Sequence, residues 1–118
     1  MKYLCLVYHD EKKLDDLPTR EYDILVAATL AYDEEIRTSG HFISSNVLDD
    51  VQTATTIRAR GGSVSVTVGP FAETREQLGG YVLIKARDLS EAIRVASQMP
   101  PTRIGCIEVR PIKKLNPW

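Results

Sequence analysis

The sequence predicts an α+β domain with a ferredoxin-like plan, in which an antiparallel sheet carries two helices on one face. Three observations lead to this prediction. An apolar run opens the chain, two segments repeat apolar residues at helical spacing, and the segments between them are rich in β-branched residues and divided by glycine turns. The chain of 118 residues has the length of a single domain, which we expect to span residues 1–118.

Residues 3–8, with the sequence YLCLVY, are predicted to form an interior strand that is buried on both faces. The run is apolar throughout and ends at the polar stretch HDEKK. This run is too short for a signal peptide or a membrane span, so we expect a cytoplasmic protein with no membrane partner. Its two cysteines, Cys5 and Cys106, should then stay reduced, and because both lie in apolar runs we expect them to pack as small hydrophobic residues.

A long helix is predicted from Thr19 to Ser39, because Pro18 and Thr19 suit its start and Gly40 suits its end. The residues of its expected sheet-facing stripe recur at intervals of three and four, namely Tyr22, Leu25, Thr29, Tyr32 and Ile36. Thr29 places a hydroxyl in the middle of that stripe. Its side chain either bonds back to its own helix or lines a pocket, and we favour the first alternative.

The middle of the chain is expected to hold a short strand, residues 41–48, followed by a hairpin. The two segments of the hairpin, residues 53–60 and 63–68, are joined by a tight turn at Gly61-Gly62. The second segment alternates strictly, with Val64, Val66 and Val68 on one face and Ser63, Ser65 and Thr67 on the other.

The last third of the chain predicts a strand, a short helix and a closing strand. After the strand at residues 81–86, Asp88 can cap the helix while Glu91 completes a capping box, and Pro100-Pro101 ends the helix. The closing strand, residues 104–112, alternates Ile107 and Val109 against Glu108 and Arg110. The apolar stripe of the helix consists of Leu89, Ala92, Ile93, Ala96 and Met99.

Two helices can cover only one face of such a sheet, so the opposite face needs a second cover. A second copy of the chain would supply it. We therefore expect a homodimer.

Two stretches of the sequence resemble the YCII-related family, and specifically its DGPF branch. They are residues 69–100, which read GPFAETREQLGGYVLIKARDLSEAIRVASQMP, and residues 105–112, which read GCIEVRPI. The opening MKYLCLVYHDE is similar to the first strand of that branch. This resemblance implies a ferredoxin-like fold that pairs as a dimeric α/β barrel. The Asp-Gly-Pro-Phe motif is matched by Gly69, Pro70 and Phe71, but Val68 stands at the position of the aspartate, so no role of that carboxylate carries over.

The same resemblance implies two kinds of function. One branch is found alongside alternative sigma factors, which implies a small-molecule-binding or regulatory module. Remoter members resemble enzymes with a His-Asp dyad, the best-known activity being removal of chloride from a chlorinated hydroxyquinol. Counting from Gly40 and Pro100 places Thr29 at the position of the histidine and Met99 at that of the aspartate. Neither side chain can act as an acid or a base near neutral pH, so the dyad is not evident here.

Three residues are candidates for catalysis. His9 follows the first strand and would act as a general base, and Tyr81 would present its hydroxyl at the mouth of a cavity. Glu73 lies in the loop after the GPF motif, which is detailed enough to be functional. A pocket lid and a dimer clasp explain that loop equally well.

The expected ligand-binding residues are Thr29, Arg58, Arg60, Phe71 and Tyr81. Arg58 and Arg60 share one face of the hairpin, and a guanidinium fork suits an anionic ligand such as a carboxylate. Salt bridges across neighbouring strands or across the dimer explain the same two arginines, and we favour that interpretation.

The composition argues against several classes of partner. Fifteen basic and sixteen acidic residues are interspersed and leave a formal charge of −1, so we expect no nucleic-acid partner. The two histidines lie apart and no Cys-x-x-Cys spacing exists, so we expect no metal, and no cofactor is expected either. The function hypotheses rank as a small-molecule-binding or regulatory module first, an enzyme acting on small aromatic or quinone-like compounds second, and a structural interaction domain third.

Overall fold

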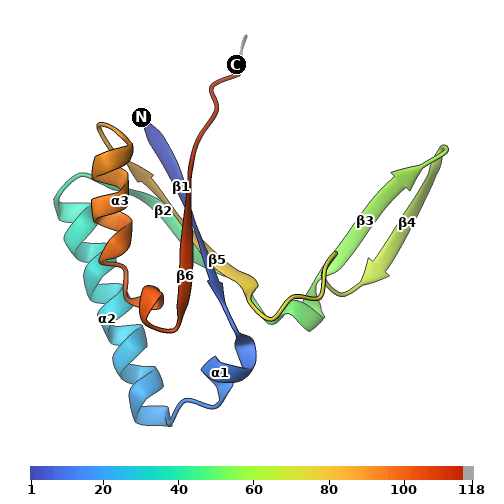
Figure 1. Cartoon of the computed structure of the whole chain (residues 1–118), viewed down its shortest axis with the longest axis horizontal. Coiled ribbons are helices and arrows are strands. Elements are labelled where there is room, and N and C mark those ends of the chain that lie inside the picture. Colours follow the sequence, from blue (N-terminus) through green and yellow to red (C-terminus); the bar gives the residue numbers. More distant parts are fainter. Residues whose placement is uncertain (116–118) are drawn as a thin grey trace.

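The computed structural model describes residues 1–115, so the last three residues of the predicted domain lie outside the described part. Its main layer is a four-stranded antiparallel sheet in the order β2-β5-β1-β6. Two helices, α2 (Thr19–Thr38) and α3 (Leu89–Ser97), pack on one side of this sheet (Figure 1). The predicted α+β class and antiparallel sheet are confirmed. The strands are β1 (Lys2–His9), β2 (Phe42–Val47), β5 (Gln77–Lys85) and β6 (Gly105–Pro111).

Strand β1 lies inside the sheet, as predicted, between β5 and β6. The expectation that both of its faces are buried is wrong for the chain by itself. Tyr3 and Cys5 are buried on the face toward the helices, whereas Leu4 and Leu6 are only half-buried. Alternate residues of a strand point to opposite faces. The second face of the sheet is therefore open, because α2 and α3 both cover the first (Figure 1).

The hydrophobic core lies between the sheet and the two helices. Strands contribute Tyr3, Cys5 and Ile84, and helices contribute Ile36 and Val95. The two helices are also joined directly, because the hydroxyl of Tyr32 in α2 donates a hydrogen bond of 2.7 Å to the carbonyl of Val95 in α3. Met99 is buried in the same core.

A short helix, α1 (Glu11–Asp15), follows β1 where the sequence pattern predicted only a polar boundary. Asp10 caps it by accepting a hydrogen bond of 3.0 Å from the backbone N–H of Lys12. Two short 3₁₀ turns, η1 (Val51–Thr53) and η2 (Pro100–Arg103), complete the helical elements of the described residues.

The predicted cap of α3 is confirmed, but the capping box is modified. The carboxylate of Asp88 accepts a hydrogen bond of 2.9 Å from the backbone N–H of Glu91. The carboxylate of Glu91 accepts one of 3.1 Å from the backbone N–H of Arg87, one residue before the cap. Glu91 also lies 3.2 Å from the imidazole of His41, so it links the start of α3 to the segment after α2.

Strand β5 begins at Gln77, earlier than the predicted strand at residues 81–86, and includes two glycines that precede that range. Gly79 and Gly80 are both buried. A Cβ atom on Gly80 would lie 2.8 Å from the carbonyl oxygen of Asn46 in the neighbouring strand. This close approach of β2 and β5 therefore requires glycine at position 80.

The predicted hairpin is confirmed as a separate two-stranded sheet of β3 (Thr55–Arg60) and β4 (Ser63–Val68). The turn residues Gly61 and Gly62 both have positive φ, which suits a tight hairpin turn. The hairpin extends from the body of the molecule on the side opposite α2 and α3 (Figure 1).

The expectation for the cysteines holds for one of the two. Cys5 is buried, but Cys106 is exposed. Cys106 pairs with Tyr8 in the register of β1 and β6, so its side chain lies on the open face of the sheet.

The helices are too short or too polar for a membrane span. Within residues 1–115, none is long and apolar enough to cross a bilayer.

Candidate ligand-binding groove

A groove with a volume of about 380 Å³ lies between α2 and the sheet. The groove exists because β5, which lies opposite α2, has a glycine and therefore no side chain at position 80. Val7 of β1 pairs with Gly80 of β5, and on the other side Val47 of β2 pairs with the same glycine. Where a larger residue would fill the space under α2, Gly80 leaves it empty. The walls of the groove are mostly aliphatic and aromatic and include Val7, Tyr22, Leu25, Val26, Leu30 and Val82.

His9 places a titratable group in the groove at the end of β1. Its ring lies in the space that a Cβ atom on Gly79 would enter, with Cε1 and Nδ1 as the nearest atoms. Gly79 therefore determines where the imidazole lies. The adjacent Asp10 caps α1 and does not line the groove.

Asp33 is a groove residue that sequence reasoning missed. It is half-buried, and the loss of solvent raises the pKa of its carboxyl group, while the positive charge of Arg37 acts in the opposite direction. The carboxyl group of Asp33 therefore keeps its proton to a somewhat higher pH than an exposed aspartate does. The signal in the sequence was its spacing, four residues after Thr29 on the same helix face.

Thr29 meets both alternatives considered from the sequence. Its hydroxyl donates a hydrogen bond of 2.8 Å to the carbonyl of Leu25, which is the favoured interpretation, and the residue also lines the groove. Because the proton of the hydroxyl is used within the helix, Thr29 faces a ligand as an acceptor. Met99, its counterpart in the dyad comparison, lies in the core and not in the groove.

Tyr81 borders the groove, but its register places its side chain on the opposite face of the sheet. It pairs with Leu6 of β1 and with Asn46 of β2. Its hydroxyl accepts a hydrogen bond of 2.9 Å from the amide of Asn46. Tyr81 therefore belongs to the open face of the sheet, across β5 from the groove.

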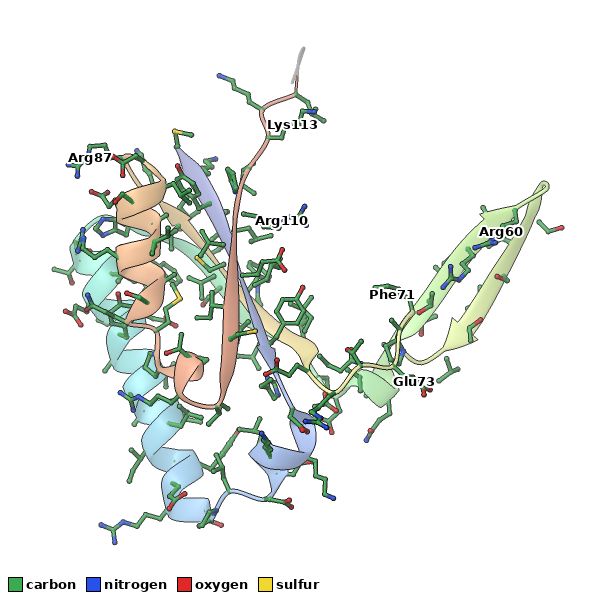
Figure 2. The ribbon with its side chains drawn as sticks, in the orientation of Figure 1. Arg60, Phe71, Glu73, Arg87, Arg110 and Lys113 are labelled. Atoms are coloured by element: carbon green, nitrogen blue, oxygen red, sulfur yellow. The ribbon has the colours of Figure 1, made fainter. Side chains whose placement is uncertain are left out.

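The other predicted site residues lie away from the groove. Glu73 lines a second, more polar cavity of about 460 Å³ between the GPF loop and α1. Phe71 is 80% exposed and lies beside the base of the hairpin (Figure 2). Arg58 and Arg60 are exposed on the hairpin, and neither has an ion-pair partner among residues 1–115. Within β6, the carboxylate of Glu108 lies 3.5 Å from the guanidinium group of Arg110.

The groove is lined by few polar side chains, and they are of kinds that bind organic molecules. His9, Asp33 and Ser45 combine with apolar walls. Nowhere in the described residues do three or more His, Cys, Asp or Glu side chains gather in a way that could hold a metal ion.

The chain is similar to a known protein family, to a bacterial protein and to a solved structure. The model of the YCII-related domain matches residues 1–116. An uncharacterized protein of Rhizobium meliloti (strain 1021), R00369, is 32% identical over 121 residues, which covers 99% of this chain and 96% of that protein. The solved structure of the 5-chloro-2-hydroxyhydroquinone dehydrochlorinase of Burkholderia phenoliruptrix AC1100, in complex with 2,5-dihydroxybenzoquinone, has a TM-score of 0.55 at 16% identity, covering 96% of this chain and 94% of the enzyme. At that identity, the likeness shows the fold alone.

Proposed function

This chain belongs to the YCII-related domain family, and on that premise we propose that it binds a small aromatic or quinone-like molecule in the groove between α2 and the sheet. The observation that carries the proposal is the composition of that groove. Its volume of about 380 Å³ suits a small organic ligand. Apolar walls would hold the faces of a ring, and a few polar groups would hold its substituents.

The polar groups of the groove match a ring that carries oxygens. The carboxyl group of Asp33 would accept a hydrogen bond from a hydroxyl substituent of the ring. His9 would either donate or accept, depending on which ring nitrogen carries the proton. The molecule bound to the dehydrochlorinase, 2,5-dihydroxybenzoquinone, has this chemistry and serves as the first probe.

The motif residues Gly69, Pro70 and Phe71 support placing the chain in the DGPF branch. The family resemblance includes a branch found alongside alternative sigma factors, and binding without turnover would suit such a regulatory module. A second function, an enzyme on the same class of compounds, is favoured by one specific observation. His9 and Asp33 bring two side chains that can gain and lose a proton to one groove. In that case these two residues would replace the dyad whose positions are held by Thr29 and Met99.

We also propose that the chain is ferredoxin-like and forms a homodimer as a dimeric α/β barrel. The strand order β2-β5-β1-β6, with α2 and α3 on one side, supports the first part. The open face of the sheet supports the second, because Leu4, Leu6 and Leu83 lie there without a cover from the described residues of this chain. Light scattering at micromolar concentration should give the mass of a dimer, and a stable monomer would contradict this proposal.

Isothermal titration calorimetry with 2,5-dihydroxybenzoquinone tests the binding proposal. Val26 and Ile24 are both exposed on α2, but only Val26 lines the groove. Val26→Trp should fill the groove and weaken binding at least about tenfold, whereas the matched variant Ile24→Trp should bind as the wild type does. Equal binding by the two variants, or no binding of quinones and hydroxyquinols by the wild type, would overturn the proposal. Turnover of a chlorinated hydroxyquinol that is lost in Asp33→Asn would support the enzyme.

A further inference from the structure

The hairpin has one apolar face and one polar face. In its register Ile57 pairs with Val66, Ala59 with Val64, and Thr55 with Val68, so these six residues share a face. The four larger ones are strongly exposed, with Ile57 and Val64 at 66%, Val66 at 67% and Val68 at 82%. No described residue of this chain covers this apolar hairpin face.

An uncovered face of this kind is notable for two physical reasons. The largest contiguous apolar patch on a soluble monomer, typically a few hundred Å², is often functional, and a hairpin of two strands is only marginally stable in water unless a third element packs on it. The hairpin shares no backbone pairing with the main sheet. The molecule is also extended for its length, with a radius of gyration of 16.4 Å, while a compact domain of this size has about 13.5 Å. The chain thus presents an arm whose apolar side lacks a partner among the described residues.

We propose that the apolar hairpin face packs against a second copy of this chain, so that each copy in a two-fold dimer clasps the other. The exposed area favours this partner. A fully buried aliphatic side chain removes on the order of 100 Å² from water, so four that are about two-thirds exposed offer roughly 300 Å². One arm on an unrelated partner would bury about 600 Å² in total, which is less than a stable complex needs. A two-fold axis repeats the contact and brings the total to about 1,200 Å².

The position of the hairpin fits the same partner. It extends on the side of the sheet opposite α2 and α3, which is the side of the open sheet face, and Arg60 marks its outer half in Figure 2. A second copy that covers the open face is therefore within reach of the hairpin. The clasp rests on the dimer proposed above. Val68, which stands at the position of the motif aspartate, extends the apolar hairpin face by one residue pair where a carboxylate would interrupt it.

Analytical ultracentrifugation of two matched variants of the full chain tests the clasp. Val66→Asp places a charge on the apolar hairpin face, and Thr67→Asp places the same charge on the polar face of the same strand. We expect Val66→Asp to raise the dimer dissociation constant at least about tenfold and Thr67→Asp to change it less than about threefold. Equal dissociation constants for Val66→Asp and the wild type would overturn the clasp while leaving the sheet-face dimer in place.

A wild type that is monomeric at micromolar concentration would overturn the clasp and the dimer together, and calorimetry would still test the groove on that monomer. Hydrogen exchange supplies a measurement that needs no variant. Amides of residues 55–68 in the wild type should exchange more slowly above the dimer dissociation constant than below it. Identical exchange at both concentrations would contradict the clasp even if the Val66→Asp protein failed to fold.

Discussion

The imidazole ring of His9 lies where a side chain on Gly79 would have to go. The two residues are therefore coupled, and a methyl group at position 79 must push the ring out of its place in the groove. Gly79→Ala should weaken binding of 2,5-dihydroxybenzoquinone about tenfold, and His9→Ala should do so to a similar extent. Calorimetry on the double variant should show little further loss, because the same contact is removed twice. Additive losses would mean that Gly79→Ala weakens binding by a route that does not involve His9.

Asp33 should make stability depend on pH in a defined direction. Its pKa is raised above the ordinary value of 3.8 by burial, so the folded state holds the proton more tightly than the unfolded state. Stability from this source is present below pH 3.8 and is lost as pH rises through the folded pKa. Asp33→Asn should match the wild type near pH 3 and exceed it near pH 7 by a few tenths of a kcal/mol, a small effect because solvent reaches the group. If the environment of Asp33 were ordinary, thermal unfolding would show the same stability difference between Asp33→Asn and the wild type at every pH in this range.

Tyr32→Phe should destabilise the contact between α2 and α3. The variant loses the hydrogen bond to the Val95 carbonyl, and we expect the free energy of unfolding to fall by about 1 kcal/mol. Urea denaturation measures this as a lower midpoint with an unchanged slope. Tyr3→Phe is the matched control, since among residues 1–115 the Tyr3 hydroxyl donates only one weak hydrogen bond, of 3.8 Å, to the sulfur of Met1. A similar loss in both variants would assign the effect to the core and not to the helix contact.

Glu91 should contribute stability that disappears in acid. The hydrogen bond from the Arg87 backbone N–H, assisted by His41, holds the pKa of Glu91 below its ordinary value of 4.5. Stability from this source is present above pH 4.5 and is lost as pH falls through the folded pKa. The melting temperature of Glu91→Gln should therefore lie below that of the wild type at pH 6 and approach it at pH 3. Glu34→Gln, which removes an exposed partner of Arg37, should show no such convergence.

Cys5 should be inert to thiol reagents in the folded protein, because burial raises its pKa to about 11. In the Cys106→Ser variant, the remaining thiol should react with Ellman's reagent at least about a hundredfold more slowly in buffer than in guanidinium chloride. Rapid labelling of the folded variant would show that Cys5 is more accessible than its place in the core indicates.

The order of the main elements was predictable from the sequence because hydrophobic spacing carries that information. The stripe that includes Tyr32 and Ile36 predicted helix α2, and Pro18 and Gly40 predicted its bounds to within one residue. Helix α1 was missed although its signal was present, since Asp10 followed by Glu11 is a normal helix start. Five residues of polar sequence, however, resemble a loop as much as a helix.

The groove was only partly predictable. Thr29 could be placed on the right helix face from its spacing, and so could Asp33. That a cavity lies beneath them depends on Gly80 being paired between Val7 and Val47, and strand pairing of residues far apart in sequence cannot be read from local patterns. For the same reason, Phe71 was grouped with Tyr81 although the two lie at different places in the fold.

The pairing of β1 also has a consequence for how the chain folds during synthesis. The first strand to be made binds only to strands that begin at residues 77 and 105. Its backbone amides and carbonyls have no sheet partner while the intervening residues are being translated. The sheet can close only after residue 111 has left the ribosome, so pairings between distant parts of the chain must form late, and such pairings are slow to form. Until then, the apolar run of β1 is a segment that the cell must protect from aggregation.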